Sequence, residues 1–265
     1  MRKRRFPQIV KPLVIVGLII LSLLVALRHV SGVLSNASYL KIKEVIIIKD
    51  DPVDISYLKG KNIFAIDLRR ESRYILEAYP NYRRIRMVRI FPNRLYVGFV
   101  KRSPLAMVRL YRYFYVDEDL VLFDMPQQES IQDLPVIVGL ETRIFSPRSG
   151  RKQEIKELAL AVDIITEAGR NRNLKDYTIK KVDVSSPDSA SFFMITPYGH
   201  TGSLATVLNP VPAVVEVKVG QGNIKSKMNV LAGLLAQLQK DVPDLKYIDL
   251  RFKEPVVKLS TAKEK

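Results

Sequence analysis

The sequence predicts an α+β protein: an N-terminal apolar helix, a small domain ordered strand, helix, helix, strand, strand, and a larger antiparallel sheet carrying two helices. Three patterns support this fold class. A long apolar run comes first, two strand-like runs meet at Pro92-Asn93, and from residue 103 short strand-like runs alternate with two amphipathic helical segments.

The first 30 residues predict a single transmembrane helix. Leu13 to Leu27 is an uninterrupted apolar run, and a helix over residues 12–30 is long enough for the ~30 Å hydrocarbon core. The basic residues of segment 1–11 are expected to stay in the cytoplasm, which places the bulk of the chain outside it. The alternative is a signal peptide cleaved near Val30-Ser31-Gly32.

A linker and a small domain follow the apolar run. Residues 31–40 are small and polar, and residues 41–102 form a compact pattern. Its expected elements are a strand at 41–48, a helical turn at 54–58, a helix capped by Asp67 and ended by Pro80, and strands at 82–91 and 94–101.

Residues 103–260 predict the larger antiparallel sheet, followed by a polar tail at 261–265. Asp117 and Asp119 are interpreted as turn formers rather than as an acid–base pair. Asn223 is the expected cap of the second helix. The expected strands are 105–110, 111–116, 120–123, 177–184, 191–196, 203–207, 213–219, 247–252 and 255–259, and the helices are 151–168 and 224–240.

The net charge of +16 indicates an anionic neighbour. Basic residues are dense between 69 and 112, and four arginines form a candidate patch for anionic lipid or an acidic protein: Arg83, Arg84, Arg86 and Arg94. The alternative is a solvated strand face. Nucleic acid is not expected as a partner, because the predicted topology places these residues outside the cytoplasm.

Catalytic and cofactor signals are weak. The chain has no cysteine and only two histidines, His29 and His200, neither with a carboxylate at ligand spacing. Gly220 to Lys227 lacks the spacing of a phosphate-binding loop. We therefore expect no cofactor, no metal site and no enzymatic activity.

Six stretches follow one another in a recognisable order: KGKNIFAIDL (59–68), AYPNYRRIRMVRIFPNRLYVGFVKRSPLAMV (78–108), YFYVDEDLVLF (113–123), LPVIVGL (134–140), VKVGQGNIKSKMNVL (217–231) and YIDLRF (247–252). By these stretches the chain resembles the bacterial cell-division proteins of the FtsQ/DivIB family.

The resemblance implies a POTRA domain at 41–102 and an FtsQ-type β-domain at 103–260. It also implies a non-enzymatic, single-pass scaffold of the divisome in the cytoplasmic (inner) membrane at the division site, linked to septal wall synthesis. The implied partners are FtsB-like and FtsL-like bitopic proteins, and other divisome proteins at the POTRA domain. Alternatives are a POTRA-bearing component of another envelope assembly or secretion system, and an enzyme of envelope metabolism.

By the same resemblance, the terminal strands bind the FtsB-like partner by β-augmentation. In an extended strand, Tyr247, Asp249 and Arg251 would share one face, and Pro255 is a departure that shifts where pairing starts. The alternative is that these strands only close the domain's own sheet. The implied contact residues are Tyr247, Arg251, Phe252, Val256, Val257 and Lys258.

Overall fold

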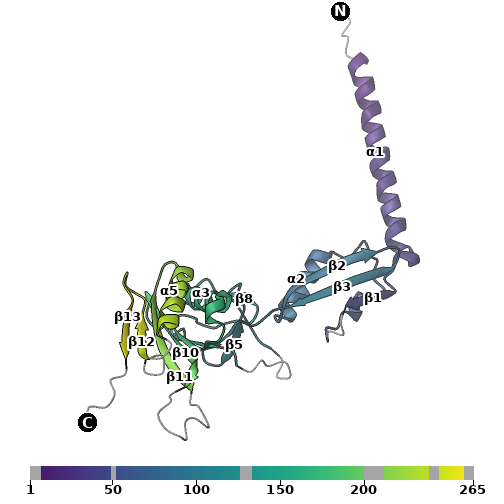
Figure 1. Ribbon diagram of the computed structural model, residues 1–265. Coiled ribbons are helices and arrows are strands. Elements are labelled where there is room, and N and C mark those ends of the chain that lie inside the picture. The colour runs from purple at the N-terminus through teal and green to yellow at the C-terminus, as the bar shows by residue number, and fades with distance from the viewer. Residues whose placement is uncertain (1–6, 49–51, 126–132, 200–211, 239–244, 260–265) are drawn as a thin grey trace, which may run out of the picture. The chain divides into compact units, whose positions relative to one another are not determined.

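The computed structural model describes residues 7–48, 52–125, 133–199, 212–238 and 245–259. The chain forms two compact units, 1–101 and 102–265 (Figure 1). The strand predicted at 203–207, His200 and the tail at 261–265 lie outside the described residues.

The N-terminal helix α1 runs from Pro7 to Asn36 and contains the predicted apolar run. Its large apolar side chains between Leu13 and Leu27 are exposed. Within the residues that the structure describes, no helix satisfies both the length and the hydropathy that a membrane span requires. The transmembrane helix at 12–30 therefore stays a prediction.

The small sheet of the first unit has the strand order β1-β3-β2, with β1 parallel to β3 and β2 antiparallel to β3 (Figure 1). Helix α2 contacts β2. The elements are β1 (Glu44–Ile48), η2 (Ser56–Leu58), α2 (Leu68–Ala78), β2 (Tyr82–Ile90) and β3 (Arg94–Lys101), which agrees with the predicted order.

Asp67 caps α2, as the sequence predicts. Its carboxylate accepts the backbone N–H groups of Arg69 and Arg70 at 3.0 and 3.2 Å. These bonds hold the pKa of Asp67 below its ordinary value. The amphipathic helix buries Ile75 in the same apolar core as Leu95 and Val97 of the sheet.

The second unit contains a sheet in the order β13-β12-β11-β10-β9-β7-β4-β5-β6-β8 (Figure 1). Its strands are β4 (Ala106–Arg109), β5 (Tyr113–Val116), β6 (Val121–Phe123), β7 (Val136–Val138), β8 (Arg151–Lys152), β9 (Thr178–Asp183), β10 (Ser189–Gly199), β11 (Pro212–Gly220), β12 (Leu245–Asp249) and β13 (Val256–Leu259).

The prediction that this sheet is antiparallel is wrong, because three neighbouring pairs are parallel. They are β4 with β7, β7 with β9, and β11 with β12. Helix α3 (Lys156–Arg170) lies between β7 and β9 in sequence, and α5 (Ile224–Gln237) lies between β11 and β12. A helical crossover returns the chain to the same end of the sheet, so the strands that it joins run parallel.

Helix α3 differs from its predicted bounds at both ends, since it ends at Arg170 rather than at 168, and α5 differs at its C-terminal end. α3 begins at Lys156 rather than near 151, because Arg151 and Lys152 pair with β6 as strand β8. α5 begins after Asn223, whose side chain accepts the Ser226 N–H at 3.0 Å, as predicted. The helix ends at Gln237.

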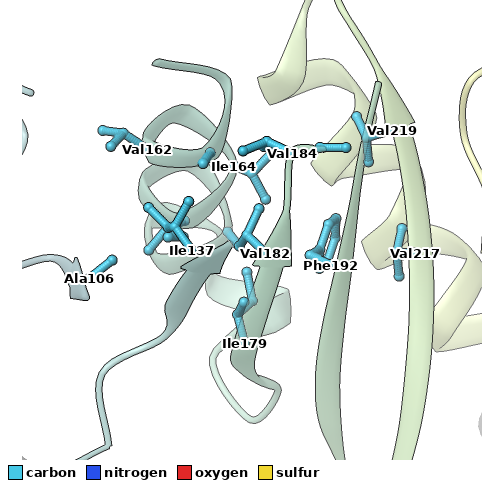
Figure 2. Packing of buried hydrophobic residues seen from close by; sticks show 14 of the residues in the cluster. Ala106, Ile137, Val162, Ile164, Ile179, Val182, Val184, Phe192, Val217 and Val219 are labelled. Atoms are coloured by element: carbon cyan, nitrogen blue, oxygen red, sulfur yellow. The ribbon is translucent and has the colours of Figure 1, made fainter. Parts of the chain in front are cut away.

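The core of the second unit lies between the helices and one face of the sheet. Figure 2 shows Ile137, Val182, Phe192 and Val217 side by side on neighbouring strands, with Ile164 of α3 close to them. All five side chains are fully buried. The core therefore fixes the register of the central strands, because a slip by one residue would turn these side chains to the other face.

Gly139 lies in the tight turn after β7, where a side chain should destabilise the fold. Its φ is +91°, and an added Cβ would lie 2.4 Å from the Ser185 backbone nitrogen. We expect Gly139→Ala to lower the free energy of unfolding by at least about 2 kcal/mol.

Gly169→Ala is the matched control, because its Cβ meets no atom within 4 Å inside α3. It should stabilise the chain by up to about 1 kcal/mol. Urea unfolding followed by circular dichroism measures both changes, and equal stability of the two variants would contradict the prediction.

Candidate functional site

The two C-terminal strands form one edge of the large sheet. β12 runs parallel to β11, and β13 pairs antiparallel with β12. The β12–β13 ladder places Tyr247 opposite Lys258 and Ile248 opposite Val257. Among the described residues, no strand lies beyond β13. One side of β13 is therefore open to a further strand.

The direction of the backbone groups on β13 follows from a single hydrogen bond. Leu250 donates its N–H to the Lys218 carbonyl oxygen of β11 at 2.7 Å. The direction of backbone hydrogen bonds alternates from residue to residue along a strand. The N–H and C=O of Ile248 therefore also point toward β11, whereas those of its two neighbours point toward β13. Ile248 and its partner Val257 are thus a non-bonded pair. Val257 consequently directs its N–H and C=O away from β12.

Apolar side chains surround this open edge. Val256 and Leu259 are each 47% exposed, and Phe252 is 63% exposed. Val257 differs, because its side chain packs against the buried core. The edge therefore offers backbone hydrogen-bonding groups at Val257 with exposed apolar groups on either side. Pro255 lies in the turn before β13, so it takes no place in the strand.

The turn between the two strands is held by Asp249 and Arg251. The buried Asp249 carboxylate accepts the Arg251 backbone N–H at 3.0 Å and its guanidinium Nη2 at 2.6 Å. The side-chain hydrogen bond from Arg251 holds the pKa of Asp249 below its ordinary value.

The expectation that residues 247–252 form one extended strand with alternating faces is wrong. β12 ends at Asp249, so Arg251 and Phe252 lie outside the strand. The physical reason is that the Asp249 side chain bonds the backbone two residues ahead, which turns the chain out of the sheet. Arg251 lies 5.8 Å from the Phe252 ring centroid, so the two predicted contact residues are neighbours in the turn.

Tyr247 lies on the sheet face opposite the core, between two lysines. Lys218 Nζ of β11 lies 4.8 Å from the Tyr247 ring centroid, and Lys258 Nζ of β13 lies 5.9 Å from it. These cation–π contacts brace the ring across three strands. The six predicted contact residues are therefore brought together at one corner of the sheet.

The four arginines of the predicted anionic-surface patch belong to the other unit. Arg83, Arg84 and Arg86 are exposed on β2. Arg94 on β3 forms an exposed ion pair with Glu44 of β1 at 3.1 Å. Two of the four, Arg84 and Arg86, line a shallow surface depression together with Arg69 and Arg73 of α2.

Sequence reasoning missed Asp249 and Leu259 as parts of the edge. Asp249 was expected on the strand face, but it organises the turn. The spacing Asp-x-Arg was the available signal, because an aspartate often bonds the N–H two residues ahead. Leu259 lies two residues after Val257 in the same strand. Whether its backbone groups are paired depends on the register shift at the end of the β12–β13 ladder, which the sequence does not reveal.

Comparisons with known proteins give one consistent result. Residues 106–251 match the family described as "Cell division protein FtsQ/DivIB, C-terminal". The chain is also similar to proteins named "Cell division protein FtsQ" from three organisms. These are Geotalea daltonii (25% identity over 79% of this chain and 70% of the relative), Geobacter sp. strain M21 (25%; 75% and 65%) and Syntrophotalea carbinolica (28%; 75% and 64%). The matched segments thus span about two thirds of each relative's length.

The lowered pKa of Asp249 predicts how the terminal turn responds to acid. A folded-state pKa below the unfolded value of about 3.9 stabilises the fold above that pH, and the contribution is lost as pH falls through the folded pKa. Asp249→Asn should therefore cost about 1 kcal/mol at pH 7 and progressively less below about pH 4.

Urea unfolding at a series of pH values measures this change. Asp176→Asn, which removes an exposed carboxylate in the same unit, serves as the control. A constant stability difference between the native chain and Asp249→Asn across the acid range would contradict the prediction.

Proposed function

Because this chain belongs to the FtsQ/DivIB family of cell division proteins, we propose that it is a non-enzymatic scaffold of the machinery that builds the division septum. It recruits partners through the open edge of its C-terminal sheet and links them to septal wall synthesis. The observation that carries this proposal is the outward direction of the Val257 backbone on β13. Among the described residues, this strand has a neighbour on one side only.

The proposed partner at this edge is an FtsB-like bitopic protein, which in turn holds an FtsL-like protein. A strand of the partner would pair with β13 and satisfy the outward N–H and C=O of Val257. Val256, Leu259 and Phe252 supply exposed apolar surface for its side chains. Lys258 supplies positive charge beside the same edge, which favours a partner segment that carries acidic residues, whereas the charge of Arg251 is paired with Asp249.

We further propose that α1 anchors the chain in the cytoplasmic membrane at the division site, with residues 1–11 in the cytoplasm. Support comes from the uninterrupted apolar run between Leu13 and Leu27 and from the exposure of its side chains. The basic residues at the N-terminus favour this orientation. The part of the first unit that follows α1 and the whole second unit would then lie outside the cytoplasm.

For the first unit we propose that residues 41–102 are a POTRA domain that docks other divisome proteins. Support comes from its sheet order β1-β3-β2 with α2 against β2. The exposed Arg83, Arg84 and Arg86 offer an anionic partner a basic surface on this unit. Residues 103–260 are then the β-domain that carries the partner-binding edge.

Val257→Pro tests the edge directly. Proline removes the outward N–H while leaving the bonds to β12, so partner binding should weaken by about tenfold and the melting temperature should change little. The measurement is titration of the full chain in detergent with the extracytoplasmic segment of the organism's own FtsB-like protein.

Lys258→Pro is the matched control. Lys258 is opposite Tyr247 at a bonded pair, so this proline removes a bond within the protein's own sheet. It should lower stability by about 1 kcal/mol or more. If Val257→Pro binds the partner as tightly as the native chain does, the terminal strands only close the sheet.

Phe252→Glu tests the apolar part of the contact. Phe252 is 63% exposed, so the change should leave stability within about 0.5 kcal/mol. We expect weaker partner binding, by about tenfold, because the new charge would be desolvated in the interface. Tyr113→Glu, which alters a 56% exposed aromatic residue on β5, should leave binding unchanged. An equal effect of both changes would contradict a localised site.

A further inference from the structure

One end of the first unit carries two exposed aromatic rings in contact. The rings of Phe64 and Phe91 have centroids 5.3 Å apart, although the two side chains are 54% and 59% exposed. Neither ring belongs to the apolar core of the unit. An exposed aromatic pair on a rigid support is an unusual use of surface, because more than half of each side chain stays in contact with water.

Backbone hydrogen bonds hold both rings in place beside the segment that follows α1. Ile63 N–H donates to the Leu40 carbonyl oxygen at 3.0 Å, and Ile42 N–H donates to that of Lys61 at 2.9 Å. Lys43 N–H donates to the Asn93 carbonyl oxygen at 2.9 Å, at the tip of the β2–β3 hairpin. Segments 40–43, 61–64 and 91–93 therefore form one surface, which we call the tip.

The tip is tethered to the apolar helix by a short segment. α1 ends at Asn36, and Ile42 is already bonded into the tip. Six residues span at most about 20 Å when fully extended. Wherever α1 points, the tip stays within that distance of its end. Tyr39, within this tether, is a third exposed aromatic side chain.

The charge of the tip is positive. Three exposed lysines lie on the bonded segments: Lys41, Lys43 and Lys61, the last with its Nζ 4.9 Å from the Tyr57 ring centroid. Glu44 is the acidic residue next to them, and it is paired with Arg94. Aromatic side chains with flanking lysines match the boundary between acyl chains and anionic headgroups, where the rings enter the interface and the ammonium groups meet phosphate.

We propose that the tip docks on the surface of the bilayer that holds α1, with Phe64 and Phe91 inserted between anionic headgroups. This inference rests on the membrane anchoring under the proposed function. The docked tip would fix the orientation of the first unit relative to the membrane, and so the direction in which its arginine-bearing strand β2 faces. The assigned occupant is anionic lipid rather than an acidic protein, because the tether keeps the tip next to the bilayer.

The absence of tryptophan from the sequence gives a direct test. Single reporters are introduced into the full chain in vesicles of phosphatidylcholine with phosphatidylglycerol that carry brominated acyl chains. The Phe91→Trp and Phe64→Trp reporters should be quenched at least about twofold more strongly than Tyr74→Trp, since interfacial aromatic groups reach the acyl boundary. Tyr74 is the matched control, 62% exposed in the same unit and outside the tip.

A second arm tests the charge. Adding Lys41→Glu and Lys43→Glu to Phe91→Trp should reduce its quenching by about half or more, because each basic residue near an anionic surface contributes to binding. Lys225→Glu with Lys246→Glu, on exposed positions of the other unit, should have no effect. Equal quenching in pure phosphatidylcholine would contradict the assignment of anionic lipid.

A Leu24→Trp reporter separates the two proposals. If it is quenched while Phe91→Trp behaves like Tyr74→Trp, the anchor stands and tip docking is wrong. If Leu24→Trp itself is not quenched, the membrane anchoring fails and the tip proposal falls with it. Protection of Phe91→Trp only after addition of an acidic partner protein would also overturn the proposal, since the occupant would then be protein.

Discussion

One row of apolar side chains across the large sheet fixes the arrangement of the second unit. Each residue is opposite the next in the strand registers. All but the last are buried in the same core and the last packs against it, so a shift of any one strand would break the row. Its last residue is on the edge strand. The row runs Phe114, Val108, Ile137, Val182, Phe192, Val217, Ile248 and Val257.

The row explains how the sheet can have a free edge with a defined register. Because the Val257 side chain packs against the core and its strand pairs with β12, its N–H and C=O point outward. The opposite face carries a second row, in which Tyr247 lies between Glu216 and Lys258. The turn closed by Asp249 and Arg251 then places Phe252 beside the edge. Rigid support of this kind lowers the entropy cost of adding a partner strand.

The high positive charge is divided between structural and exposed roles. Arg89 donates to the carbonyl oxygens of Ile63 and Ile66, which fastens the loop that carries Phe64. Arg102 forms a largely buried ion pair with Asp117 at the start of the second unit. Other basic residues, among them Arg83, Arg84 and Arg86 of β2 and the lysines of the tip, remain exposed for anionic neighbours. The amino-acid composition gives only the net charge and does not separate these two groups of basic residues.

The sequence by itself determined the order of elements in the first unit, the two helices of the second unit, the caps at Asp67 and Asn223, and the family resemblance carried by its motifs. These follow from local periodicity and short-range hydrogen bonds. The sequence did not predict strands β7 and β8. Only the tertiary structure decided the parallel pairing of β11 with β12, the burial of Asp249, and the outward direction of the Val257 backbone. The reason is that strand neighbours and hydrogen-bond direction depend on contacts between residues far apart in the chain, and local pattern does not encode them.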